Sequence, residues 1–283
     1  MPEFIDAYGV AIVYDVHLPT AAPRAVVQLV HGAGEYAGRY GPTIAALTDA
    51  GYAVYADDHR GHGRTGMRQH GGDPAKIGKL GPGGHRAAVA AVRHLTDIIR
   101  SEHPGVPLVL LGHSWGSLIS QILLNDTPET YDLVVLSGTA LRWPGWLNGG
   151  DLNAPWKGPD AMGTEWLSSD LSVARAFFDD PLTTSERVTK LFGIRDALRL
   201  LGKPRKNLGR DVPVLLMVGR DDTLGGPRSV HKLADAYRSR SGLTDVTTLV
   251  YPGARHELFN EVMQDEVRAD LLAWLDARLP ARD

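Results

Sequence analysis

Short apolar runs rich in β-branched residues alternate with amphipathic helical patterns along most of the chain, and this alternation constrains the fold more than any other feature. Strand-length runs occur at residues 9–17, 25–30, 53–56, 108–111, 133–136, 214–218 and 247–250. Between them apolar residues recur at helical spacing, as in Ala88, Val92, Leu95 and Ile99. This alternation predicts an α/β fold with a mostly parallel central sheet covered by helices on both faces.

One segment, residues 139–210, interrupts the alternation. It is rich in Pro, Gly and Trp and contains no strand candidate, while apolar stretches at 191–194 and 197–201 indicate packed helix. We expect residues 1–138 and 211–283 to form the core and residues 139–210 to form an inserted helical cap, or lid. A connecting excursion without a cap role is the alternative.

Composition excludes several classes of function. The net charge is -3 without a basic stripe, so we expect no nucleic-acid partner. The absence of cysteine excludes disulfides, Cys-ligated zinc and a thiol nucleophile. The start of the chain lacks the features of a signal peptide, and the apolar runs are too short to span a bilayer. We therefore expect a cytoplasmic protein with no integral membrane segment, and the oligomeric state is not indicated.

The sharpest local signal is the stretch Leu-Val-Leu-Leu-Gly-His-Ser-Trp-Gly-Ser at residues 108–117, which gives Gly112-x-Ser114-x-Gly116 between a strand and a helix. A sharp strand-to-helix turn strains its central residue and exposes that side chain above the sheet edge. The adjacent helix N-terminus favours developing negative charge. The pattern predicts Ser114 as a nucleophile.

A serine hydroxyl needs a general base, which is in turn oriented by an acid. Around such a serine turn, the acid and the histidine follow later in the chain, each on a loop after a strand. His256 follows the last predicted strand. Asp221 and Asp222 both follow the preceding strand, and the spacing from Gly219 favours Asp222 as the acid. Ser114, Asp222 and His256 are therefore the expected catalytic residues.

An oxyanion hole would complete this site. The glycine-rich turn at 31–35 follows a buried strand, so the backbone N–H of Ala33 can point toward Ser114. The second expected donor is the backbone N–H of Trp115, directly after the nucleophile. Each such donor typically lowers the barrier by about 3–4 kcal/mol.

Four stretches together resemble the monoacylglycerol lipase and lysophospholipase branch of the α/β-hydrolases, in the serine aminopeptidase S33-type family. They are His31–Tyr40 (HGAGEYAGRY), Asp58–Gly63 (DHRGHG), Gly112–Gly116 (GHSWG) and Tyr251–Glu257 (YPGARHE). The resemblance implies the same triad and oxyanion donors, an α/β-hydrolase fold with an inserted cap, and hydrolysis of monoacylglycerol, lysophospholipid or similar medium-to-long acyl esters.

The chain departs from the family pattern beside the nucleophile. The family commonly has Met and a Gly-Gly pair after the serine, whereas Trp115, Gly116 and Ser117 stand here, and Tyr36 replaces a usual His. The bulk of Trp115 narrows the expected acyl site. We expect substrate contacts from Glu35 and from tryptophans of the insertion, namely Trp143, Trp146 and Trp166. Transient contact of the cap with a lipid surface is a further expectation.

No cofactor or metal is expected, because Asp58-His59-Arg60-Gly61-His62 lacks the spacing of a binuclear metal motif. Short-chain esterase, amidase, peptidase and other α/β-hydrolase reactions remain open, since fold alone does not decide among them. A ligand-binding receptor with a dormant triad is a remote non-enzymatic alternative.

Overall fold

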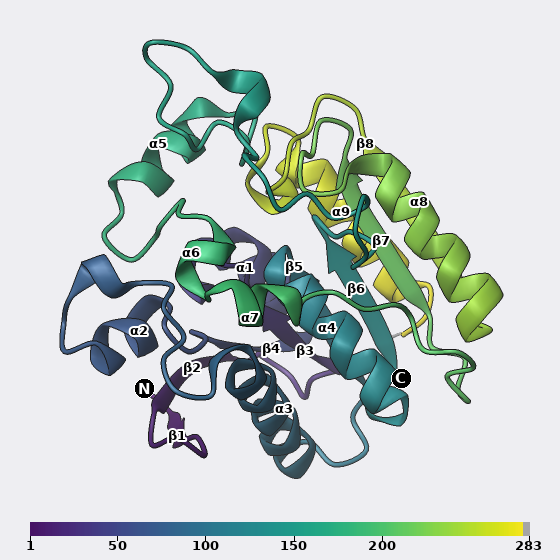
Figure 1. The fold of residues 1–283 in the computed structure, drawn as a ribbon. Coiled ribbons are helices and arrows are strands. Elements are labelled where there is room, and N and C mark those ends of the chain that lie inside the picture. The colour runs from purple at the N-terminus through teal and green to yellow at the C-terminus, as the bar shows by residue number, and fades with distance from the viewer. Residues whose placement is uncertain (280–283) are drawn as a thin grey trace.

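The computed structural model describes residues 1–279, which form a sheet of eight strands in the order β1-β2-β4-β3-β5-β6-β7-β8 (Figure 1). The pairings of β2 with β1 and with β4 are antiparallel, and the pairings among β3 to β8 are all parallel. The strands are β1 (Glu3–Ile5), β2 (Ala11–His17), β3 (Ala25–Val30), β4 (Tyr52–Asp57), β5 (Leu108–His113), β6 (Leu133–Ser137), β7 (Val214–Gly219) and β8 (Val246–Tyr251).

Helices cover both faces of this sheet, because each central strand is apolar on both sides (Figure 1). The helices of the core are α1 (Gly41–Asp49), α2 (Gly63–Gln69), α3 (Gly84–Glu102), α4 (Trp115–Asp126), α8 (Gly226–Ala236) and α9 (Gln264–Asp276). Val26 and Val30 of β3 pack in one apolar cluster with α3, α4 and α8, whereas Val27 and Leu29 pack in another with α1 and α9. The predicted α/β fold class is confirmed.

Residues 139–210 connect β6 to β7 through short helices: α5 (Leu171–Asp179), α6 (Val188–Leu191) and α7 (Ile194–Leu198). α5 lies at the top of the view in Figure 1, and α6 and α7 lie below it, toward α3 and α4. The segment is hydrogen-bonded to several loops of the core. Thr184 N donates to Gly34 O (2.8 Å) in the loop after β3, and Glu257 N in the loop after β8 donates to Leu167 O (2.7 Å). These two loops follow β3 and β8, so the insertion lies over the carboxyl edge of the sheet.

The expected strands all occur, with ends shifted by a few residues. The sequence pattern did not predict β1, a three-residue edge strand that pairs with β2 and buries only Phe4. The apolar stretch at 191–194 does not form one helix, because α6 ends at Leu191 and Gly193 adopts φ +81° before α7 begins. Among residues 1–279, no helix combines the length and hydrophobicity of a membrane-spanning segment.

Candidate active site

Ser114 stands at the junction of β5 and α4, in a backbone conformation with φ 51° and ψ -123°. Within residues 1–279, Asn207 is the only other non-glycine residue with positive φ. Such a conformation costs of the order of 1–3 kcal/mol and persists only where the surroundings enforce it. Here Ser114 N is held by a hydrogen bond to Ser137 O (2.9 Å) at the end of β6.

The glycines around Ser114 are required by close packing. A Cβ on Gly116 would lie 2.0 Å from Val30 O, and one on Gly112 would lie 2.4 Å from Ser120 Oγ. A Cβ on Gly32 would lie 3.0 Å from Ser114 Cβ. The turn after β3 therefore lies directly against the serine, and the G-x-S-x-G spacing allows α4 to pack onto β3.

His256 and Asp222 lie together on the loops after β8 and β7. His256 Nδ1 is 3.0 Å from Asp222 Oδ2, and both side chains are buried. The other oxygen of Asp222 accepts from Leu224 N at 2.8 Å. Asp221, the competing carboxylate, is exposed. The structure thus places Asp222, and not Asp221, against the imidazole.

The pKa of His256 reflects opposing effects. Burial lowers this pKa, but the charge and hydrogen bond of Asp222, with the charges of Glu257 and Glu35, raise it above the usual 6.5. His113, whose ring centroid lies 4.8 Å away, has its own pKa lowered by burial and by the charge of His256. The imidazolium of His256 is therefore stabilised by neighbouring carboxylates, while His113 stays neutral beside it.

Ser114 and His256 both adjoin the end of β6. Ser114 is bonded to Ser137, and a Cβ on Gly138 would lie 3.0 Å from His256 Cε1. His256 Nε2 is buried and has no hydrogen-bond partner among residues 1–279, so the structure contains no hydrogen bond between it and Ser114. The ring of Trp166 lies beside that of His256, with centroids 4.7 Å apart and the ring planes tilted by 37°.

The turn at 31–35 is braced by a buried carboxylate. Glu35 Oε1 accepts from Gly32 N (2.6 Å) and from the hydroxyl of Tyr40 (2.7 Å). Burial raises the pKa of Glu35, as does the charge of Glu257, whereas Arg39 opposes this shift. Glu35 thus fixes the backbone on which Ala33 lies. Trp115 opens α4, so its N–H belongs to the first helical turn, which lacks intrahelical acceptors.

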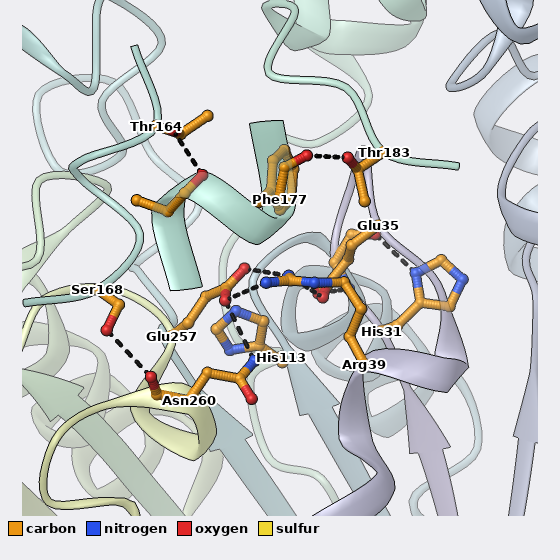
Figure 2. Close-up of polar contacts among 12 residues, drawn as sticks. His31, Glu35, Arg39, His113, Thr164, Ser168, Phe177, Thr183, Glu257 and Asn260 are labelled. Atoms are coloured by element: carbon orange, nitrogen blue, oxygen red, sulfur yellow. Dashed lines mark hydrogen bonds and ion pairs between the residues drawn. The ribbon is translucent and has the colours of Figure 1, made fainter. Parts of the chain in front are cut away.

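Arg39 joins this turn to the histidine loop, and Figure 2 shows its guanidinium between two carboxylates. Arg39 Nη1 donates to Glu35 Oε2 at 3.0 Å, and Nη2 donates to Glu257 Oε2 at 2.8 Å. Glu257 directly follows His256. The ring of Phe177, on α5, lies 4.7 Å from Arg39 Cζ. Arg39 therefore contacts the turn after β3, the loop after β8 and the insertion.

A cavity of about 350 Å³ opens beside Ser114. Core residues Ala33, Trp115 and Leu118 line it, and the insertion supplies most of the remaining wall. That wall includes the apolar side chains of Leu147, Trp166, Phe177, Val188, Ile194, Leu198, Leu200 and Leu201. The volume is within the range of small-molecule sites, which are mostly apolar with few polar groups.

Of the four residues expected to contact the substrate, one lines the cavity and three do not. Trp166 lines the cavity, but Trp143, Trp146 and Glu35 do not. Trp143 is 42% exposed under the ammonium of Lys203, and Trp146 packs against the core. Glu35 faces Gly32 N, Tyr40 and Arg39 instead.

Sequence reasoning missed Arg39, His113 and Glu257 at this site. Glu35 and Arg39 stand four residues apart in the first motif, and Glu257 directly follows the expected base, so proximity in sequence was an available signal for two of them.

A serine on a strained strand-to-helix turn, followed in the chain by a buried Asp–His pair on the same edge of a mostly parallel sheet, is the arrangement of an α/β-hydrolase. Residues 21–263 match the family described as serine aminopeptidase, S33. The chain belongs to this family and is a hydrolase.

Known proteins of similar sequence and structure include lipases and esterases. A monoacylglycerol lipase of Mycolicibacterium smegmatis is 34% identical, over 98% of this chain and 97% of that protein. The monoglyceride lipase of Homo sapiens is 27% identical, over 98% and 91%. Among solved structures, a thermostable carboxyl esterase from Bacillus coagulans superposes with a TM-score of 0.86 at 24% identity, covering 98% of each chain. The monoacylglycerol lipase of Paleococcus ferrophilus gives 0.70 at 25% identity, over 94% of this chain and 99% of that one.

Proposed function

We propose that this protein is a serine carboxylester hydrolase that cleaves monoacylglycerols or similar esters with one acyl chain. The observation that carries the proposal is the buried Asp222–His256 pair at the sheet edge where Ser114 opens into an apolar cavity. In the described part of the chain, Nε2 of His256 has no hydrogen-bond partner. The names of the M. smegmatis and human relatives support the substrate class.

In this proposal the reaction is a two-step acyl transfer. The Ser114 hydroxyl attacks the ester carbonyl carbon while His256 Nε2 takes its proton, and Asp222 stabilises the resulting imidazolium. The carbonyl oxygen becomes an oxyanion that the backbone N–H groups of Ala33 and Trp115 would hold. The C–O bond then breaks, and the alcohol leaves with the proton from His256. Water repeats the sequence and releases the carboxylic acid from Ser114.

The proposed role of the insertion is that of a cap. Residues 139–210 supply most of the cavity wall, which favours a cap over a connecting excursion. Ile194 and Leu198 lie one helical turn apart on α7, line the cavity and are 73% and 60% exposed. Apolar side chains that are both exposed and at a cavity mouth suit transient contact with a lipid surface.

The test is hydrolysis of p-nitrophenyl esters of increasing acyl length, of a monoacylglycerol, of a lysophospholipid and of an aminoacyl p-nitroanilide. We expect ester cleavage by the wild type and a fall of about 10³-fold or more for Ser114→Ala. A fluorophosphonate probe should label the wild type and not the variant. An unlabelled wild type would favour the receptor alternative, and faster anilide than ester cleavage would favour a peptidase.

A further inference from the structure

The side chain of Trp115 lies between the cavity beside Ser114 and the interior of the protein. It follows Ser114 directly and opens α4, so its backbone is fixed by the same turn that strains the serine. The indole is 2% exposed, and it lines the cavity with Ala33 and Leu118. One part of this side chain therefore faces the space next to Ser114, while the rest is packed into the protein.

Aromatic rings enclose the buried part of the indole. The ring centroid of Phe192 lies 4.8 Å from that of Trp115, and those of His62 and His59 lie at 5.1 Å and 5.6 Å. Phe192 directly follows α6, so the insertion supplies one side of this enclosure. The indole of Trp115 thus fills the space between the cavity and these three aromatic rings, two from the core and one from the insertion.

A hydrogen bond sets the orientation of the indole. Trp115 Nε1 donates to His85 Nδ1 at 3.3 Å, and His85 lies in the first turn of α3. Burial, opposed by the charge of Asp196, lowers the pKa of His85 to about 4, so its ring is neutral and able to accept this bond at neutral pH. Because buried indole N–H groups need a partner, His85 favours one rotamer of Trp115 over others.

The wall that Trp115 helps to form suits a hydrocarbon chain. Trp115, Leu118, Phe192 and Leu200 belong to one contiguous apolar cluster, and three of them line the cavity. Apart from Ser114, the polar residues of the wall, such as Asn148, Asn153 and Ser185, lie on the insertion. An acyl chain gains most from the apolar wall, whereas a glycerol hydroxyl group needs polar partners.

We propose that Trp115 determines the acyl-length specificity of the cavity, and that its bond to His85 holds the indole in the position that limits the length of the acyl chain that the cavity accepts. This inference rests on the proposed esterase function. The side chain excludes the part of a long acyl chain that would extend toward His62 and Phe192. A smaller, unbranched side chain at this position would open that space.

The test compares kcat/KM across p-nitrophenyl esters of increasing acyl length for the wild type and for Trp115→Met. The readout is the ratio of a long-chain to a short-chain ester, so a general loss of activity does not affect it. We expect this ratio to rise about 10-fold or more, because one methylene in an apolar pocket is worth about 10–200-fold. Trp274→Met is the matched control: Trp274 packs on α9 and bonds Thr247, away from the cavity, and its variant should keep the wild-type ratio.

A second variant tests the hydrogen bond without changing the wall. His85→Ala removes the acceptor while Trp115 remains, and we expect the long-to-short ratio to rise by less than in Trp115→Met. An unchanged ratio in Trp115→Met would overturn the specificity role, and an unchanged ratio in His85→Ala would overturn the role of His85. A wild type without Ser114-dependent ester cleavage would instead overturn the proposed function, so the two failures are distinguishable.

Discussion

The strained backbone of Ser114 has a consequence for stability that is independent of its chemistry. Glycine adopts positive φ without the penalty that a side chain brings. We therefore expect Ser114→Gly to be more stable than Ser114→Ala by about 1–3 kcal/mol, with both inactive. Urea unfolding of the two variants checks this. Equal midpoints and equal slopes would show that the turn stores no strain.

The pH dependence of hydrolysis should report His256. Its pKa lies above 6.5, and the proposed base must be neutral to accept the proton of Ser114. Activity should therefore be lost as the pH falls through a value above 6.5. In Asp222→Asn the main influence that raises this pKa is gone, so the acid limb of kcat/KM should move to lower pH while kcat falls by about 10⁴-fold.

The matched control for that prediction is Asp221→Asn. Asp221 stands next to Asp222 in the chain but is exposed, so this variant should keep the wild-type rate and acid limb. If the acid limb of the kcat/KM profile keeps its wild-type position in Asp222→Asn, a group other than His256 controls the pH dependence.

At the level of helices and strands, the sequence predicted most where burial is greatest. Strands β3, β5, β6 and β7 are buried on both faces, so they appear in the sequence as nearly continuous apolar runs. The edge strand β1 escaped prediction because three residues with one buried side chain carry no periodicity. In the insertion, Gly193 breaks an apolar stretch that reads as continuous helix, and only the backbone conformation shows this.

The candidate site likewise contains residues that the sequence pattern predicts and residues that it does not. The order of Ser114, Asp222 and His256 along parallel strands, each followed by a loop, is sufficient to predict that the three lie at one sheet edge. The pairing of Arg39 with Glu257 joins residues 218 positions apart, and no local pattern encodes it. The packing of Trp143 outside the cavity is likewise a property of how the insertion folds onto the core.

Across the whole molecule, Arg39 holds distant parts together. Its side chain is 11% exposed, and those of Glu35 and Glu257 are 3% and 4% exposed. Removing one partner from a buried ion pair leaves uncompensated charge and costs about 3–5 kcal/mol. We expect Arg39→Met to lower the free energy of unfolding by about this amount, measured by urea denaturation.

The control for Arg39 is Lys190→Met, which breaks the exposed pair of Lys190 with Glu186 on the insertion. Exposed pairs contribute about 0–1 kcal/mol, so this variant should resemble the wild type. Comparable losses in both variants would contradict the view that burial gives the Arg39 network its importance.

The main-chain hydrogen bond from Thr184 N to Gly34 O joins the insertion over the cavity to the turn that is expected to form the oxyanion hole. If the insertion moves away to admit a substrate, that bond must break, and the turn expected to polarise the ester carbonyl loses one of its supports. In that case we expect substrate entry and ester cleavage to take place in two successive conformations of the protein. In the open conformation the oxyanion turn would lack this support, so a bound ester would not yet be cleaved efficiently.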